Sequence, residues 1–189
     1  MRDGEGPLIG IVGYIAPLKG QEEFVRAAVR IIREFPRAKF FIAGDILFRR
    51  KNRRFFKKLK TISDEDPYLR GNLFFTGYYA DIYLFMKSMD LIIQPSWIEG
   101  WGRTVCEAFS CNVPVICSSV GGIPEIIKFE PEKYLVPVKE INSIVEKSLM
   151  ILRDRNLIKD SLEKNRDFSR TEFSIEKHYK EVQEVYNGI

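Results

Sequence analysis

Short apolar runs alternate along this chain with longer segments whose apolar residues recur at helical spacing. The apolar runs are LIGIVG (8–13), AKFFIAG (38–44), NLFFTG (72–77), DLIIQPS (90–96), VPVICS (113–118) and the weaker YLVP (134–137). Between them lie segments such as EEFVRAAVRIIREF (22–35), whose hydrophobic residues fall on one side of a helix. This alternation is typical of βα units that form a parallel sheet. We therefore predict an α/β fold, a Rossmann-like doubly wound parallel sheet of about six strands with C-terminal helices.

The whole chain is expected to form a single domain. It has 189 residues, 45% of them hydrophobic, and no Pro/Ser-rich linker divides it. Residues 140–189 are charged and helical in pattern, with breaks expected at Asn156 or at Arg170–Thr171. The sequence has neither an apolar run of membrane-spanning length nor a signal peptide, which favours a cytoplasmic location. Its three cysteines lack CxxC spacing, so we interpret them as reduced packing thiols and expect no metal site.

The order of strands in such a sheet predicts where a ligand would bind. In the commonest doubly wound order the first and fourth strands are neighbours, and ligands bind at the carboxyl ends of the strands where the order reverses. The loop GYIAPLKG (13–20) would then face the loop QPSWIEGWG (94–102) across a crevice. A third loop, SSVGGIPE (118–125), leaves the fifth strand at the same edge.

The residues of these loops suit an anion. Gly100 and Gly102 allow the backbone to approach a ligand closely, and a helix beginning near Arg103 would present free N–H groups and the positive end of its dipole. Lys19 in the facing loop adds a cation suited to phosphate, and Arg103 could add a second. We interpret the crevice as a diphosphate site.

Two carboxylates flank this anion site. Glu107 falls about one turn into the helix, where it could bind the vicinal hydroxyls of a ribose, and Glu99 in the loop could bind other hydroxyls. A diphosphate between two polyols is a nucleotide sugar. Each acid taken alone is equally an ordinary solvated carboxylate. A glycosidase acid pair is a poorer interpretation, because those carboxyls face each other across the scissile bond.

The segment PSWIEGWGRTVCEAFSCNVPVICSSVGGIPEII (95–127) resembles a known family. A Pro-Ser pair, two glutamates separated by seven residues, a Pro-Val strand and a GGxPE turn are similar to the pattern of retaining GT-B glycosyltransferases of family 4, the glycosyl transferases group 1. Further matches are APLKG (16–20), IAGD (42–45), FFTGYY (74–79) and FSIEKHYKEVQEVY (173–186). The resemblance implies one half of a GT-B architecture. The chain would be the C-terminal nucleotide-sugar-binding domain, with the N-terminal acceptor domain absent, and we expect it to be inactive alone.

The resemblance also implies roles for individual residues. Glu99 and Lys19 would be the catalytic residues, Glu99 binding the hydroxyls of the donor sugar and Lys19 neutralising the diphosphate, while Glu107 would bind the ribose. The remaining donor-binding residues would be Gly13, Tyr14, Gly77, Tyr78, Gly100, Trp101, Gly102, Arg103 and Thr104. Family members transfer a hexosyl group to a sugar, glycan or lipid-linked acceptor with retention of configuration. They need no metal and no cofactor besides the nucleotide-sugar substrate.

One position departs from the family pattern. The family usually has a glycine-arginine pair after the first strand, and Tyr14 stands in place of the arginine. Arg103 occupies a usually aliphatic position, and we hypothesise that it partly compensates. Two alternatives stay open, a non-catalytic nucleotide-sugar-binding or regulatory half and a related sugar-nucleotide epimerase.

A basic segment, RRKNRRFFKKLK (49–60), has Phe48, Phe55, Phe56 and Leu59 among its bases. It is interpreted as a sheet-covering helix, with peripheral contact to the cytoplasmic face of an anionic membrane as the alternative. Nucleic acid is not expected as a partner, because aromatic residues at this spacing suit core packing better than base stacking.

Overall fold

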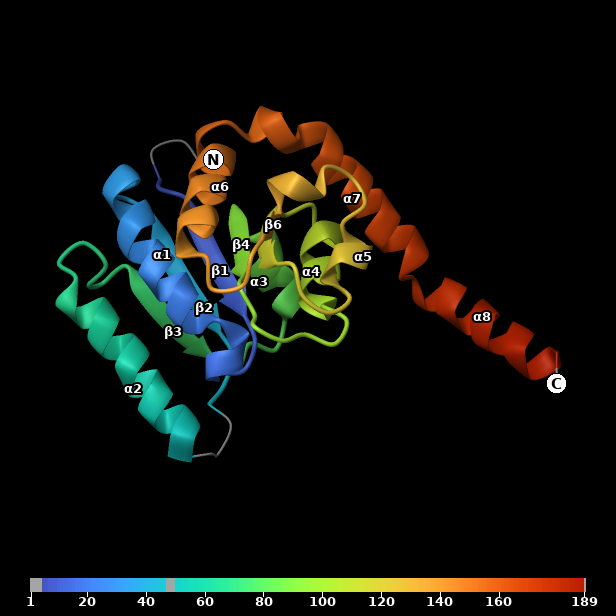
Figure 1. The fold of residues 1–189 in the computed structure, drawn as a ribbon, viewed down its shortest axis with the longest axis horizontal. Helices are drawn as coiled ribbons and strands as arrows, with labels where there is room; N and C mark the ends of the chain where they lie inside the picture. The colour runs from blue at the N-terminus through green and yellow to red at the C-terminus, as the bar shows by residue number, and fades with distance from the viewer. Residues whose placement is uncertain (1–4, 47–49, 189) are drawn as a thin grey trace.

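The computed structural model, which describes residues 5–46 and 50–188, contains a six-stranded sheet with the order β3-β2-β1-β4-β5-β6 (Figure 1). All neighbouring strands are parallel. The strands are β1 (Leu8–Val12), β2 (Lys39–Ala43), β3 (Leu73–Gly77), β4 (Leu91–Gln94), β5 (Val115–Ser118) and β6 (Leu135–Val136). The predicted α/β fold, and the predicted neighbours β1 and β4, are confirmed.

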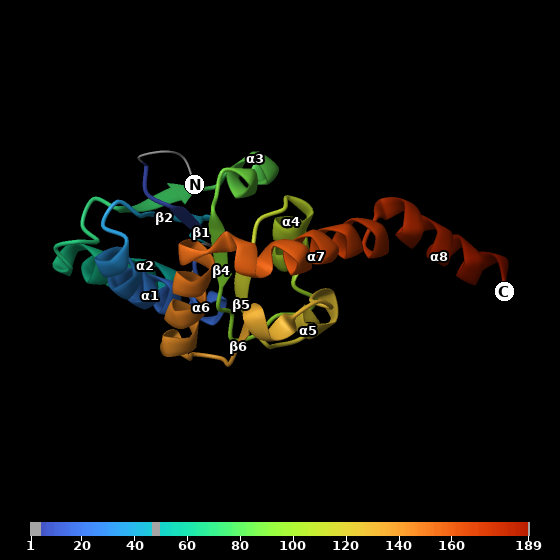
Figure 2. The same cartoon turned by 90° about the horizontal axis from the view of Figure 1, so that it is seen from above.

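Helices cover both faces of this sheet (Figure 2). On one face α6 packs against α1, which also contacts α2, and on the other α4 lies between α3 and α7. The helices are α1 (Gln21–Glu34), α2 (Arg50–Glu65), α3 (Ile82–Lys87), α4 (Arg103–Ser110), α5 (Ile123–Ile126), α6 (Ile141–Arg153), α7 (Lys159–Glu172) and α8 (Ile175–Asn187). Short 3-10 turns lie at Pro17–Lys19, Pro131–Lys133 and Arg155–Ile158.

The central strands are buried on both faces, as the parallel arrangement requires. Every residue of β4 and β5 is buried, and Ile9 and Ile11 of β1 are fully inaccessible. The apolar side of α1, including Phe24 and Ile31, completes the core against this layer. The strands end at a common edge, which carries the loops of the candidate site.

The C-terminal region differs from the prediction in one respect. The expected break at Asn156 falls within a 3-10 turn, but the break expected at Arg170–Thr171 is wrong, since α7 continues to Glu172. The Arg170 guanidinium donates two hydrogen bonds to the carbonyl of Ser110, which anchors this turn to the end of α4. The chain instead breaks before Ser174, whose hydroxyl caps α8 by accepting a hydrogen bond from the amide of Lys177.

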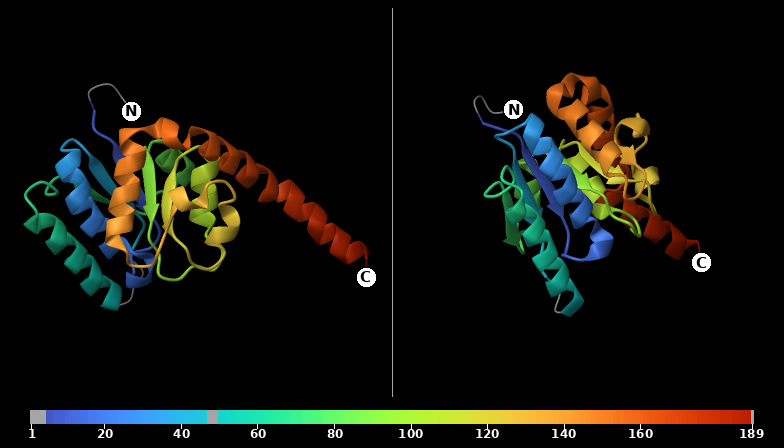
Figure 3. Two further views of the ribbon diagram at one scale, coloured as in Figure 1. Left: turned by 45° about the horizontal axis from the view of Figure 1, so that its top comes forward. Right: turned by 60° about the vertical axis from the view of Figure 1, so that its left-hand side comes forward.

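Helix α8 extends from the end of α7 away from the sheet (Figure 3). It has no buried residue, and its large hydrophobic side chains, among them Ile175 and Tyr186, are exposed. Within the described residues, no helix combines the length and the apolar character needed to cross a bilayer.

Candidate functional site

The loops after β1 and β4 meet at the carboxyl edge of the sheet. The amide of Trp97 donates a hydrogen bond of 2.9 Å to the carbonyl of Leu18 in the facing loop. Gly20 has φ +75°, and a Cβ atom there would lie 2.0 Å from the carbonyl oxygen of Pro95. Only glycine permits this approach, so the residue fixes the spacing between the two loops.

The loop after β5 completes the floor of the site. The amide of Gly122 donates a hydrogen bond of 2.9 Å to the carbonyl of Gly100. A Cβ atom on Gly121 would lie 2.0 Å from the carbonyl oxygen of Glu99. The three loops that the sequence placed at one edge are therefore in direct backbone contact.

An ion pair joins two of these loops. The Lys19 Nζ atom lies 2.6 Å from Oε1 of Glu99, and the side chains are 19% and 14% exposed. The same carboxylate oxygen accepts a hydrogen bond of 2.9 Å from the hydroxyl of Ser96. Sequence reasoning named both charged residues but neither their pairing nor Ser96. The motif includes Ser96 in its proline-serine pair, but nothing in it indicated that this hydroxyl binds Glu99.

Tyr14 lies beside the same lysine. Its ring centroid is 5.5 Å from Lys19 Nζ, within the range of a cation–π contact. Its carbonyl accepts a hydrogen bond of 3.0 Å from the side-chain amide of Gln21, which fixes the loop. At position 14, where the family usually has an arginine, this chain has a tyrosine whose aromatic face lies toward Lys19.

The start of α4 carries unpaired backbone donors. Gly102 is the N-terminal cap residue with φ +92°, and no side chain caps the helix. A Cβ atom on Gly102 would lie 2.7 Å from Ile123, so the turn requires glycine. The amides of residues 101–104 (Trp101, Gly102, Arg103 and Thr104) find no hydrogen-bond acceptor among the described residues. Free N–H groups at a helix start are suited to an anion.

The two predicted side chains of α4 are both exposed. Arg103, the first helical residue, makes no ion pair with any residue that the structure describes. Glu107 likewise makes no side-chain hydrogen bond there, and it lines a hollow of about 430 Å³. This hollow lies between α3, α4 and the junction of α7 with α8, and Tyr83 and Arg170 also line it. Glu99 thus precedes α4 in the loop, and Glu107 lies within the helix.

The carboxyl ends of β1, β2 and β3 form a shelf of backbone beside this site. The amide of Gly44 donates a hydrogen bond of 2.9 Å to the carbonyl of Gly77. The amide of Gly13 donates one of 2.9 Å to the carbonyl of Ala43. Tyr78 follows Gly77 and is 79% exposed. The structure thus places Gly13 and Gly77 on one shelf, whereas Tyr78 forms no hydrogen bond or cation–π contact with the Lys19–Glu99 pair.

Both tryptophans of the β4–α4 loop are fixed by residues distant in sequence. The Trp97 indole donates a hydrogen bond of 3.0 Å to Glu23, and Lys139 Nζ lies 3.8 Å from its ring centroid. The Trp101 ring packs edge-on against Phe173, with centroids 4.6 Å apart. These supports hold the loop from both sides, and nothing in the local motif indicated them.

The three cysteines pack in the protein interior near this region. Cys106, Cys111 and Cys117 are all free and buried. Burial raises the pKa of each thiol. They therefore stay protonated, as expected of packing residues rather than nucleophiles.

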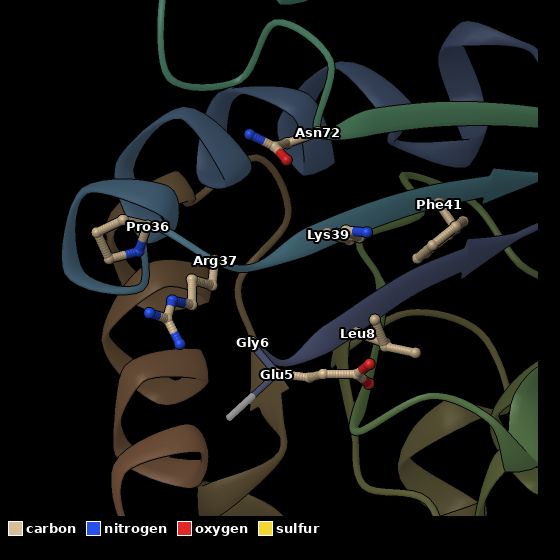
Figure 4. A pocket seen from close by; sticks show the side chains of 8 residues that line it. All are labelled: Glu5, Gly6, Leu8, Pro36, Arg37, Lys39, Phe41 and Asn72. Carbon is tan, nitrogen blue, oxygen red and sulfur yellow. The ribbon is translucent and has the colours of Figure 1, made fainter. Parts of the chain in front are cut away.

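A second hollow lies at the opposite edge of the sheet (Figure 4). It has a volume of about 620 Å³ and is lined by residues at the amino ends of the strands, among them Glu5, Leu8, Arg37, Lys39, Phe41 and Asn72. None of the predicted site residues lines it. Ligands of open parallel sheets bind at the carboxyl ends of the strands, so this hollow does not belong to the candidate site.

Known proteins share both the sequence pattern and the fold. The family model described as glycosyl transferases group 1 matches residues 2–171. N-acetyl-alpha-D-glucosaminyl L-malate synthase of Bacillus anthracis is 25% identical over 91% of this chain and 43% of its own length. The trehalose synthase of Pyrococcus horikoshii is 29% identical over 99% of this chain and 45% of its own. The chain thus spans less than half of these curated relatives.

Solved structures agree with this assignment. The crystal structure of Anabaena HepE with UDP and glucose has a TM-score of 0.89 at 21% identity, over 98% of this chain and 49% of that one. The C-terminal domain of the group 1 glycosyl transferase LpcC from Francisella tularensis has a TM-score of 0.81 at 28% identity, over 90% of this chain and 88% of that domain. The chain belongs to the glycosyl transferases group 1 family and has the fold of the C-terminal half of a GT-B glycosyltransferase.

Proposed function

We propose that this domain binds a nucleotide-diphosphate sugar and forms the donor half of a retaining glycosyltransferase that transfers a hexosyl group. One observation carries the proposal. The Lys19–Glu99 pair and the unpaired amides at the start of α4 lie on the two facing loops after β1 and β4. A cation and free N–H groups bind the diphosphate, and the two carboxylates bind the hydroxyls on either side of it.

Each residue has a defined part in this arrangement. Lys19 turns from Glu99 to the diphosphate, which the amides of residues 101–104 also bind. Glu99 then accepts hydrogen bonds from the sugar hydroxyls, and Glu107 accepts them from the ribose. The arginine that the family usually has at position 14 is missing, and Arg103 supplies a second cation instead. The nucleobase of the donor lies along the backbone shelf that ends at Gly77 and Tyr78.

The chemistry asks little of the protein beyond charge stabilisation. As the glycosidic bond to the donor breaks, negative charge develops on the leaving diphosphate. Lys19 and the amides are in place before the reaction and stabilise this charge without reorganisation, which is worth several kcal/mol for a single well-placed donor, about 3 in measured cases. The leaving diphosphate itself takes the proton of the acceptor, so no protein base, metal or cofactor is needed.

The names of two relatives support a choice of first substrates. HepE was crystallised with UDP and glucose, and a 27% identical Escherichia coli relative is named UDP-Gal:alpha-D-GlcNAc-diphosphoundecaprenol alpha-1,3-galactosyltransferase. We accordingly propose a UDP-hexose as donor and a sugar, glycan or lipid-linked acceptor. We place the acceptor on a separate N-terminal half, because this chain spans less than half of its relatives, and we expect no transfer by the domain alone.

Calorimetric titration tests the donor site directly. UDP, GDP, ADP and their glucose conjugates are titrated separately, with uridine as the control that lacks the diphosphate. We expect one nucleotide family to bind, its diphosphate to bind more tightly than the nucleoside, and the thermal midpoint to rise with it. If none of these ligands binds, the donor site is refuted.

A non-catalytic half is the second candidate, and the packing of the Tyr14 ring beside Lys19 favours it. Adding an N-terminal half from a group 1 relative distinguishes the two. Sugar transfer supports the enzyme, whereas donor binding without any transfer or donor hydrolysis supports the binding protein.

A further inference from the structure

The charges of α2 (Arg50–Glu65) run opposite to the dipole of the helix. Its first turn has bases and no acid, and its last turn has Asp64 and Glu65 and no base. The N-terminal end of a helix carries partial positive charge, so bases there destabilise it and acids at the C-terminal end do the same. A helix that breaks this rule without compensation within the fold is a candidate for function.

The bases all lie on the side of α2 that faces away from the sheet. At 100° per residue, the buried residues Asn52, Phe55, Leu59 and Ser63 share one side of the helix. The bases fall on the other side and are exposed, namely Arg50, Lys51, Arg53, Arg54, Lys57, Lys58 and Lys60. With only two acids in the helix, this excess of positive charge exceeds the net charge of +4 of the whole chain.

Six of these bases have no carboxylate partner among the described residues. Lys58 pairs with Glu22 of α1 at 2.6 Å, but the other six form no ion pair with any described residue. Some exposed bases elsewhere find partners, as Arg33 does with Asp66, and others, such as Lys159 and Lys180, pair with no described residue. What distinguishes α2 is that six unpaired bases lie within eleven residues of one helix.

The aromatic residues of the segment are not available to a ligand. Phe55 is 8% exposed, and Phe56 packs edge-on against Phe75 of β3 with centroids 4.9 Å apart. Phe48 and Arg49, which the sequence also included, lie outside the described residues. Rings that are packed in the core can neither stack on nucleobases nor insert into a bilayer. The face is thus purely electrostatic.

We propose that this face of α2 docks the protein on a membrane surface that contains anionic lipids. An exposed helix surface with six unpaired bases complements a plane of lipid headgroup charges, which attract Lys and Arg without specific geometry. The first turn of α2 lies at the same edge of the sheet as the loops after β1 and β4 (Figure 1). Docking on α2 thereby holds the candidate site close to the bilayer. This last consequence rests on the proposed function, but the membrane contact itself does not.

Vesicle flotation of the full chain tests the proposal. The vesicles are phosphatidylcholine alone or an equal mixture of phosphatidylcholine and phosphatidylglycerol. We expect binding to the mixture alone. Raising the salt from about 0.1 M to about 1 M, which shortens the Debye length from about 10 Å to about 3 Å, should release the protein because no side chain inserts. Equal binding to both vesicles, or no binding to either, overturns the proposal.

A charge-matched pair of triple variants locates the contact. Arg53→Gln/Arg54→Gln/Lys57→Gln should weaken vesicle binding by roughly a hundredfold, because each base near an anionic surface contributes about fivefold. Lys159→Gln/Lys164→Gln/Lys180→Gln removes the same charge from exposed positions of α7 and α8 and should change binding less than about threefold.

Circular dichroism and thermal midpoints check that both variants are folded. Equal loss in the two variants would mean that binding follows net charge and not α2. Duplex DNA could instead displace the protein from the vesicles, with Arg53, Arg54 and Lys57 required for DNA binding. That result would assign the face to nucleic acid. Either result overturns the proposal, and the UDP titration, which uses other residues, shows separately whether the donor site is right.

Discussion

Replacing Glu99 by glutamine tests whether its ion pair restrains Lys19 before the ligand binds. The pair has a separation of 2.6 Å, with its two side chains 19% and 14% exposed. Exposed pairs are worth about 0.2 to 1 kcal/mol, and breaking buried ones costs about 3 to 5 kcal/mol. An intermediate value of about 1.4 kcal/mol corresponds to a factor of ten in an equilibrium constant. In the proposed function Lys19 turns from Glu99 to the diphosphate, so Glu99→Gln should tighten UDP binding about tenfold.

The same substitution should lower the free energy of unfolding by about 1 kcal/mol, because Lys19 loses its carboxylate partner. Isothermal calorimetry measures the affinity and urea denaturation the stability. Glu107→Gln is the matched control, since Glu107 is exposed and makes no side-chain hydrogen bond among the described residues. It should weaken UDP binding and leave stability within about 0.5 kcal/mol. Unchanged or weaker UDP binding by Glu99→Gln would refute the restraint of Lys19.

Three further predictions concern the loops and the core. Lys19→Ala should weaken UDP binding at least tenfold and Arg103→Leu about fivefold, as charged hydrogen bonds and exposed ion pairs do; unchanged calorimetric affinity in Arg103→Leu would show that this arginine does not compensate for the family arginine. Gly20→Ala should lower the free energy of unfolding by about 3 kcal/mol, since it combines a left-handed backbone with overlap onto the facing loop. Gly71→Ala, also at positive φ but with no atom within 4 Å, should cost only about 1 kcal/mol in the same urea series, and equal costs would contradict the loop contact. Burial raises the pKa of Tyr134 to about 12. Its unfolded phenol ionises near pH 10, so the folded state binds more protons between about pH 10 and pH 12, and stability should fall there by about 1.4 kcal/mol per pH unit. Tyr134→Phe should remove that part of the slope in denaturation curves.

The fold was largely predictable because the strands are buried on both faces. Continuous apolar runs such as those of β4 and β5 stand out from segments of helical period, and a parallel sheet admits few topologies. The four-residue helix α5 was missed because Ile123–Ile126 is too short to show a period. The end of α7 was misplaced because the contact that sustains it, from Arg170 to Ser110, joins residues 60 positions apart.

The site was predictable as a set of loops but not as a set of contacts. The carboxyl ends of parallel strands share an edge, so the loops containing Lys19 and Glu99 had to meet. Their pairing is a tertiary fact that spans 80 positions. The contact of Trp101 with Phe173 is another, and it links the loop to the start of α8. Motif spacing indicates which residues serve a site, whereas their state without ligand depends on neighbours that the motif does not contain.

The Lys19–Glu99 pair gives the proposed donor an advantage over its own product. A nucleoside diphosphate can draw away Lys19, but it leaves Glu99, which is 14% exposed, with only the hydrogen bond from Ser96. In the proposed function a nucleotide sugar replaces both halves of the pair, because its hydroxyls would donate to Glu99 while its diphosphate would bind Lys19. After transfer the sugar is gone and the carboxylate again attracts the lysine, which favours release of the diphosphate. UDP-sugar should therefore bind more tightly than UDP to the native domain. Glu99→Gln should shrink or invert that ratio, because it tightens the product and weakens the sugar contact. A ratio unchanged by the substitution would show that Glu99 distinguishes neither ligand.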